Sequence, residues 1–142
     1  MNKPEKLLWQ RVKTCMGTIW DCQRHEEKYS VGIPDVSFAM KGINGWLELK
    51  YLKEWPKSGP VLIPHFTPQQ KNWLYKRNEH GGNCFLLLQI GDHYVAINGD
   101  KVLDVGSLDK EQLLSISIMD IYDPTNDKLR LALYRCIITL YY

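Results

Sequence analysis

The sequence predicts a mixed α/β fold, in which a β-sheet of four or five strands is flanked by helices. Residues 35–40 and 47–51 alternate in polarity with period two, as strands do, and only a tight turn separates them. A helix signal over 67–80 follows, and then a near-continuous apolar run over 83–90, typical of a strand that is buried on both faces. A strand–helix–strand connection is right-handed and makes its two strands parallel, whereas the tight turn makes its two strands antiparallel. The predicted sheet is therefore mixed.

Length and composition indicate one domain spanning 1–142, with a core of about 3–100. The extension 101–142 is rich in apolar residues, so we expect it either to cover the sheet or to form a dimer interface. No apolar run is long enough for a membrane span, and the first residues lack a signal-peptide pattern, so we expect a cytoplasmic protein. Four cysteines without a Cys-x-x-Cys pair indicate reduced thiols, and the net charge of +2 permits nucleic-acid binding without requiring it.

The first strand pair brings two acidic residues together. Its turn is centred on Lys41-Gly42 or on Asn44-Gly45, and both registers leave Asp35 and Glu48 on one face, because they differ by an even number of residues. We predict the turn at Lys41-Gly42, which places the two acids opposite each other with Cβ atoms roughly 4.5–5.5 Å apart. Two such carboxylates can share a hard divalent cation, with oxygen–metal distances of about 2.0–2.1 Å if the ion is magnesium.

The other elements follow from local signals. Residues 3–20 predict a first helix with an apolar stripe at Leu8, Val12, Met16 and Ile19, and residues 21–31 predict a polar connector. The helix over 67–80 has Thr67 as its N-cap and a glycine stop, and a turn at 91–92 leads into a strand over 93–97. We further expect a short helix capped by Ser107 or Asp109 and a strand within 116–122.

Residues 51–66 form a long excursion, because three prolines and a glycine exclude a regular helix. Long loops at the rim of a site often bind a substrate or a partner. Trp55 either offers a stacking surface there or folds back on the core.

Pro34-Asp35 followed by Glu48-Leu49-Lys50 resembles the PD-(D/E)xK nuclease signature. With Gly32-Ile33 before it and Thr67-Pro68-Gln69-Gln70 after it, the pattern is similar to two branches in particular. These are the Holliday-junction resolvases of archaea, bacteria and phages, and the virus-type replication-repair nuclease domain. The resemblance covers roughly residues 5–97.

This resemblance implies a restriction-endonuclease-like core and a magnesium-dependent endonuclease, with Mn²⁺ able to substitute. The substrate it implies is branched DNA, which a homodimeric Holliday-junction resolvase cuts twice. A phage-encoded member would act in the host cytoplasm. Two other functions stay open: a flap, nick or end-processing nuclease of replication and repair, and a non-catalytic DNA-binding module on the same fold.

Under the resemblance, Asp35, Glu48 and the backbone carbonyl of Leu49 hold the metal, and Glu5 joins them. Lys50 orients or deprotonates the attacking water, and Gln70 positions water or phosphate. Each role has a plainer alternative: Glu5 complements a helix dipole, Gln70 completes a capping box with Thr67, and Glu48 and Lys50 form an ion pair on an exposed sheet face.

Candidate DNA contacts lie around this site. We expect phosphates to be bound by residues of the connector, the excursion and the second helix: Arg24, Lys28, Ser30, Lys53, Lys57 and Lys71. For each one alone, a solvated surface position is the alternative.

Overall fold

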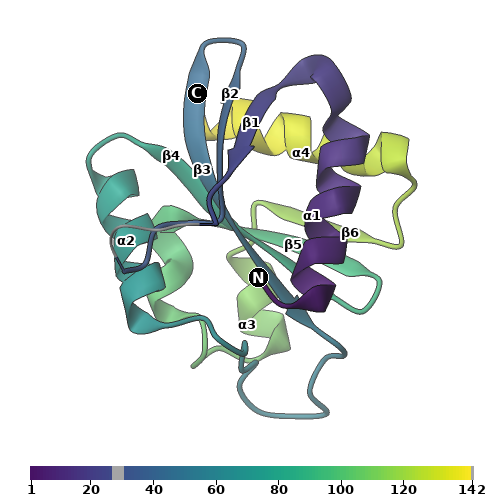
Figure 1. Ribbon diagram of the computed structural model, residues 1–142. Coiled ribbons are helices and arrows are strands. Elements are labelled where there is room, and N and C mark those ends of the chain that lie inside the picture. The colour runs from purple at the N-terminus through teal and green to yellow at the C-terminus, as the bar shows by residue number, and fades with distance from the viewer. Residues whose placement is uncertain (27–30, 142) are drawn as a thin grey trace.

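The computed structural model describes residues 1–26 and 31–141 and shows a six-stranded sheet with helices on both faces (Figure 1). The strands lie in the sheet in chain order: β1 Asp21–Arg24, β2 Val36–Met40, β3 Ile43–Leu52, β4 Asn83–Ile90, β5 His93–Asn98 and β6 Met119–Tyr122. The helices are α1 Lys3–Met16, α2 Pro68–Glu79, α3 Lys110–Ser115 and α4 Asn126–Tyr141, with 3₁₀ turns η1 Gly17–Ile19 and η2 Gly99–Asp104.

The sheet is mixed, as predicted. β3 and β4 are parallel and are joined through α2, whereas the remaining neighbours in the described sheet are antiparallel. The expected count of four or five strands is too low, because β1 adds an edge strand. Residues 21–24 were expected in a polar connector, but they pair with residues 36–39 of β2. The sequence Asp-Cys-Gln-Arg has no apolar alternation, so only its pairing partner makes it a strand.

The β2–β3 hairpin has the predicted register. Val36 pairs with Leu47 and Met40 with Ile43, so the turn is Lys41-Gly42, and both turn residues have positive φ angles of 49° and 81°. The competing signal at Asn44-Gly45 lies inside β3. Gly45 is required there for packing, because a Cβ atom would stand 2.5 Å from the ring of Phe38.

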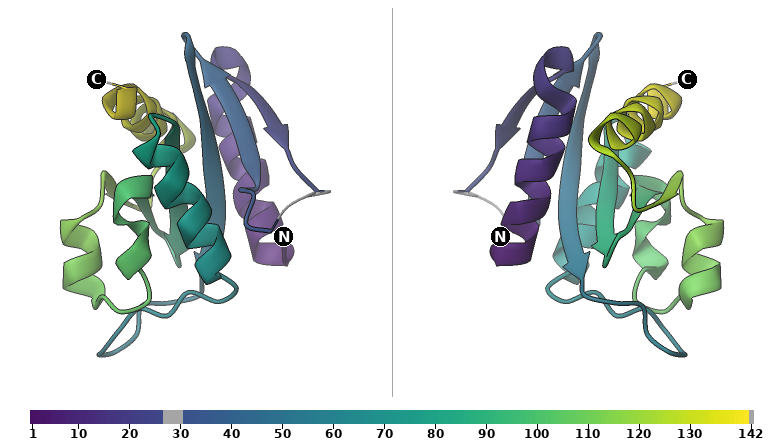
Figure 2. Two further views of the ribbon diagram at one scale, coloured as in Figure 1. Left: turned by 90° about the vertical axis from the view of Figure 1, so that its left-hand side faces the viewer. Right: turned by 90° about the vertical axis from the view of Figure 1, so that its right-hand side faces the viewer.

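Two apolar layers cover the sheet. In Figure 1, α1 and α4 lie on the right of the sheet and α2 on the left, and Figure 2 shows α1 and α2 on opposite sides of β3. One layer joins α1 and α4 to the sheet, and the other joins α2, η2 and α3 to it. Helix α1 is shorter than predicted: it ends at Met16, and Ile19, expected in the inward stripe, is 39% exposed in the 3₁₀ turn that follows.

The C-terminal segment contributes to both layers. Asp109 is the N-cap of α3, one of the two predicted caps, and α4 packs beside α1 through buried residues on one of its sides: Leu129, Leu133, Cys136 and Ile137. All four cysteines are free thiols. Across the described residues, no helix is both long and apolar enough to cross a membrane.

Candidate active site

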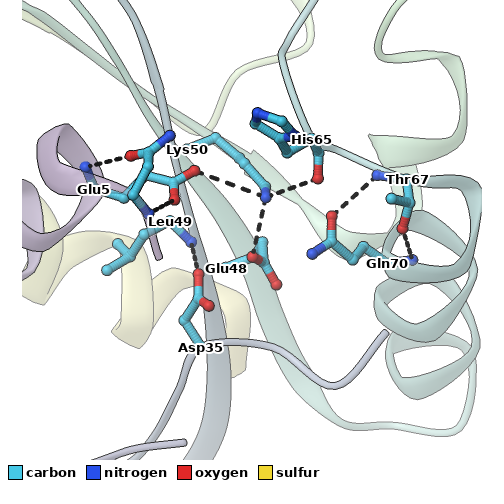
Figure 3. A network of polar contacts seen from close by, with 9 residues as sticks. Glu5, Asp35, Glu48, Leu49, Lys50, His65, Thr67 and Gln70 are labelled. Atoms are coloured by element: carbon cyan, nitrogen blue, oxygen red, sulfur yellow. Dashed lines mark hydrogen bonds and ion pairs between the residues drawn. The ribbon is translucent and has the colours of Figure 1, made fainter. Parts of the chain in front are cut away.

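Polar side chains converge at the end of the sheet where β2 begins, β3 ends and helices α1 and α2 begin (Figure 3). Asp35 immediately precedes β2, Glu48 and Lys50 lie on β3, Glu5 lies in the first turn of α1, and Gln70 lies in the first turn of α2. The structure therefore brings together all of the residues predicted for catalysis and metal binding.

Asp35 and Glu48 face each other across the hairpin. Continuing the register one step beyond Val36–Leu47 places them opposite each other, and Oδ2 of Asp35 accepts a hydrogen bond from the backbone N–H of Leu49 at 3.1 Å. Their exposed fractions are 6% and 0%. The alternative of an exposed sheet face is wrong here, because helices cover both faces of β3.

Lys50 lies at the centre of a network of charges. Its Nζ is 3.7 Å from Oε1 of Glu48 and 3.8 Å from Oε1 of Glu5, and it donates a hydrogen bond to the backbone carbonyl of His65 at 2.9 Å (Figure 3). Lys50 as a whole is only 4% exposed. The ammonium thus lies between two buried carboxylates and is fixed by a backbone oxygen.

Glu5 serves a helix cap and the site together. Its backbone N–H donates to Oδ1 of Asn2 at 3.0 Å, and its Oε2 accepts from the backbone N–H of Asn2 at 3.1 Å, which completes a capping box. Its other carboxylate oxygen faces Lys50. Both interpretations of Glu5, as a helix-terminal acid and as a member of the site, are therefore compatible with its position.

Gln70 is also a capping residue. Its backbone N–H donates to Oγ1 of Thr67 and its Oε1 accepts from the backbone N–H of Thr67, while Figure 3 shows its amide nitrogen on the side that faces Glu48. The loop before Asp35 packs against this turn: Gly32 has a φ of 90°, and a Cβ atom there would stand 2.6 Å from the carbonyl oxygen of Gln69. Helix α2 and the Asp35 loop thus fix each other's position.

The charges of the site suit a divalent cation. Glu5, Asp35 and Glu48 are buried with a single ammonium, that of Lys50, so the pocket formally has two negative charges in excess. Within the described part of the chain, no three acidic, histidine or cysteine side chains gather as a complete metal cluster. Magnesium in proteins is usually held by one or two carboxylates and keeps several water molecules. Asp35, Glu48 and the carbonyl of Leu49 are the groups that could hold it.

The predicted DNA-binding residues divide into groups. Arg24 is half-buried, pairs with Glu26 at 3.2 Å, and lines a hollow of about 470 Å³ that reaches Asp35. Lys28 and Ser30 lie outside the described residues. Lys53 and Lys57 are exposed on the excursion, as phosphate contacts must be.

Lys71 of α2 and Trp55 of the excursion make contacts within the protein. Lys71 donates to the backbone carbonyl of Val105, and its Nζ lies 5.5 Å from the ring centre of Phe66. Trp55 folds back on the core, the second of its two alternatives, and donates from Nε1 to Nδ1 of His93 at 3.1 Å.

Sequence reasoning missed Lys6 and His25, which line the same hollow as Asp35. The backbone N–H of His25 donates to the carbonyl of Asp35 at 2.8 Å, and its Nε2 lies 2.8 Å from Oγ of Ser37. Both contacts depend on the pairing of β1 with β2. No local pattern indicates that pairing, so the contribution of His25 could not be predicted from the sequence.

Comparison with known proteins supports the fold. The sequence matches no protein-family model and no curated protein. Among solved structures, Hjc of Archaeoglobus fulgidus, a Holliday junction resolvase, matches with a TM-score of 0.58 at 10% identity, over 95% of this chain and 99% of that chain. The bacterial homing endonuclease I-Ssp6803I matches with a TM-score of 0.51 at 13% identity, over 95% of this chain and 92% of that chain. A VRR_NUC domain matches with a TM-score of 0.46 at 15% identity, over 63% and 88%.

The first two likenesses confirm the predicted class of fold, a restriction-endonuclease-like core with a mixed sheet flanked by helices. Both of these structures, a junction resolvase and a homing endonuclease, align with 95% of this chain.

Proposed function

We propose that this protein is a metal-dependent DNA endonuclease that hydrolyses phosphodiester bonds. The observation that carries the proposal is the convergence of Asp35, Glu48 and Lys50 in one buried pocket at the end of β3. A nuclease fold supports it, and so does the excess of negative charge in that pocket.

Each residue has a distinct task in this proposal. Asp35, Glu48 and the Leu49 carbonyl hold Mg²⁺ or Mn²⁺, and the bound ion supplies Lewis acidity and lowers the pKa of its water. The ammonium of Lys50 orients the attacking water and stabilises negative charge that develops on the phosphate. The amide of Gln70 positions water or phosphate while its oxygen caps α2.

The substrate we propose is branched DNA, with the protein acting as a Holliday-junction resolvase. The alignment of 95% of the chain with an archaeal resolvase supports this choice. Two symmetric cuts in a four-way junction require two active sites, so a homodimer is part of the proposal. Recognition would depend on DNA shape and phosphate positions more than on base sequence.

The test compares a four-way junction, a flapped duplex, a nicked duplex and a linear duplex, each with Mg²⁺, Mn²⁺ or EDTA. We expect ion-dependent cleavage that is fastest on the junction, by a protein that light scattering shows to be a dimer. Asp35→Asn should bind the junction as wild type does but not cut it, whereas Glu79→Gln, an exposed acid at the opposite end of α2 from Gln70, should cut normally.

Other outcomes have clear meanings. Faster cleavage of the flap or the nick would assign the protein to replication and repair processing instead. Binding without cleavage of any of these DNAs, with either ion, would leave a non-catalytic DNA-binding module.

A further inference from the structure

A second hollow, of about 460 Å³, lies on the same sheet face as the acidic pair. Side chains alternate along a strand, so Ser37 and Trp46, which pair with each other, continue the face that bears Asp35 and Glu48. Helix α2 packs over β4, whereas residues of β1 and β2 line the open hollow. We call the open region the Trp46 hollow, and its lining includes Gln23, Ser37, Asn44, Trp46, Arg77 and Asn83.

Planar groups form one wall of the Trp46 hollow. The ring of Trp46 is half-buried and packs 4.9 Å from the ring of His25 and 5.1 Å from the ring of Trp73. The guanidinium of Arg77 lies 4.4 Å from the ring centre of Trp73 and 5.9 Å from that of Trp46. Partly exposed aromatic rings beside an arginine plane are the surfaces on which unpaired nucleic-acid bases stack.

The rim of the hollow carries groups that can bind the edge of a base. The amides of Gln23, Asn44 and Asn83 supply both donors and acceptors. Its charged lining residues are one acid, Asp21, and one base, Arg77. Because these charges balance, the lining suits an uncharged heterocycle better than a phosphate.

The Trp46 hollow is continuous with the acidic site through His25. That side chain lines the hollow at Asp35, packs against the ring of Trp46 at an interplanar angle of 33°, and lies 2.8 Å from the hydroxyl of Ser37. Trp46 and Glu48 are two positions apart on β3, or about 7 Å along the strand. A nucleotide next to a phosphate held at the acidic pair would therefore bring its base to the hollow.

We propose that the Trp46 hollow binds an unpaired nucleobase adjacent to the phosphodiester at the acidic site. This inference rests on the proposed function and names the feature of the substrate that the site selects. A base stacked inside a duplex cannot reach the ring of Trp46, so the base must come from a single strand, a junction, a mismatch or an extruded nucleotide.

The experiment measures binding in EDTA, so that its result does not depend on cleavage. The probes are a fully paired duplex, the same duplex with one extrahelical thymidine, and the latter with an abasic residue in place of that thymidine. Wild type should bind the extrahelical-thymidine duplex about 10-fold tighter than the other two, the order of one stacked base, and its tryptophan fluorescence should be quenched.

Trp46→Leu and Arg77→Ala should remove that 10-fold preference and leave binding of the paired duplex unchanged. Gln23 is exposed, so Gln23→Ala should fold normally, and it should reduce the preference several-fold. This variant tests the inference if Trp46→Leu does not fold. Arg135→Ala, an exposed arginine on α4, is the matched control and should behave as wild type.

Equal affinity of wild type for all three duplexes, or equal weakening of all three by Arg77→Ala, would overturn the inference. The two proposals fail separately. A protein that prefers the unpaired base but never cuts refutes the endonuclease and keeps the base site, whereas one that cuts junctions without that preference refutes only the base site.

Discussion

The ammonium of Lys50 donates a hydrogen bond to the backbone carbonyl of His65 at 2.9 Å, which ties the excursion after β3 back to the strand it leaves. His65 has a φ of 62°, in the left-handed region that few residues other than glycine adopt. The excursion therefore has a structural role at the site, because its end holds the buried ammonium of Lys50 beside the carboxylates of Glu5 and Glu48.

Removing that cation should destabilise the fold. Lys50→Met leaves Glu5 and Glu48 buried without their ammonium, at a cost of about 3–5 kcal/mol in the free energy of unfolding in EDTA. Urea titration measures this change, and Lys53→Met, at an exposed position, should cost less than about 0.5 kcal/mol. Magnesium should restore part of the loss, and equal stability of the two variants would contradict the buried network.

Magnesium should stabilise the protein in the absence of DNA. An ion that binds only the folded state at 100 times its Kd adds about 2.7 kcal/mol, which a thermal melt detects. Asp35→Asn and Glu48→Gln should abolish this gain.

Glu5→Gln is the informative comparison for the metal site. Glutamine can still complete the capping box with Asn2, so the melt of this variant in EDTA should stay close to that of wild type. We expect the Glu5→Gln variant to keep most of the stabilisation by magnesium, because the wild-type carboxylate of Glu5 already contacts Asn2 and Lys50 and is not needed to bind the ion. Complete loss of the gain would instead make Glu5 a metal ligand.

Gly32 should tolerate no side chain. In Gly32→Ala the new Cβ would meet the carbonyl of Gln69 at 2.6 Å, so α2 and the Asp35 loop must separate and cleavage should fall. Gly59→Ala is a matched control: Gly59 also has a positive φ, of 80°, but nothing lies within 4 Å of a Cβ there. Backbone strain should lower the free energy of unfolding of both variants by about 1 kcal/mol. Only Gly32→Ala should lose further stability, and only Gly32→Ala should lose cleavage activity. Normal activity in Gly32→Ala would show that this contact does not position the site.

The buried thiols should make stability fall in alkali. Burial raises the pKa of Cys84 and Cys136 from 9.0 to about 12 and that of Cys15 to about 11. Because the folded state holds these protons more tightly, the stabilisation is complete below pH 9 and is lost as the pH rises from 9 towards the folded pKa values. Urea titrations between pH 8 and pH 11 measure the slope, which Cys136→Ala should reduce by up to about 1.4 kcal/mol per pH unit. An unchanged slope would contradict the burial of Cys136.

Much of the fold was predictable because its signals are local. The Lys41-Gly42 turn fixed the register of β2 against β3, and the Thr67 cap fixed the start of α2. The helical connection between β3 and β4 then predicted that these two strands are parallel. The acidic site followed from the same register, because alternation along two paired strands decides which side chains share a face.

The features that were missed depend on contacts between distant segments. Residues 21–24 form β1 only because β2 offers a free edge, and that pairing is what delivers His25 to the site. Ile19 is exposed because Gly17 ends the helix before the predicted stripe is complete. The contact between Lys50 and His65 spans the whole excursion, whose irregular backbone carries no periodicity from which it could be foreseen.

The two-residue turn of the β2–β3 hairpin also limits how related sequences can change in length. Inserting or deleting one residue within it would rotate Asp35 to the opposite side of the sheet and into the apolar layer beneath α1. Inserting two would keep it on the correct side but slide it along β3, away from Glu48. Functional homologues should therefore keep the spacing between these two acids fixed, while the excursion after Leu52 is free to vary in length wherever a backbone carbonyl still reaches Lys50.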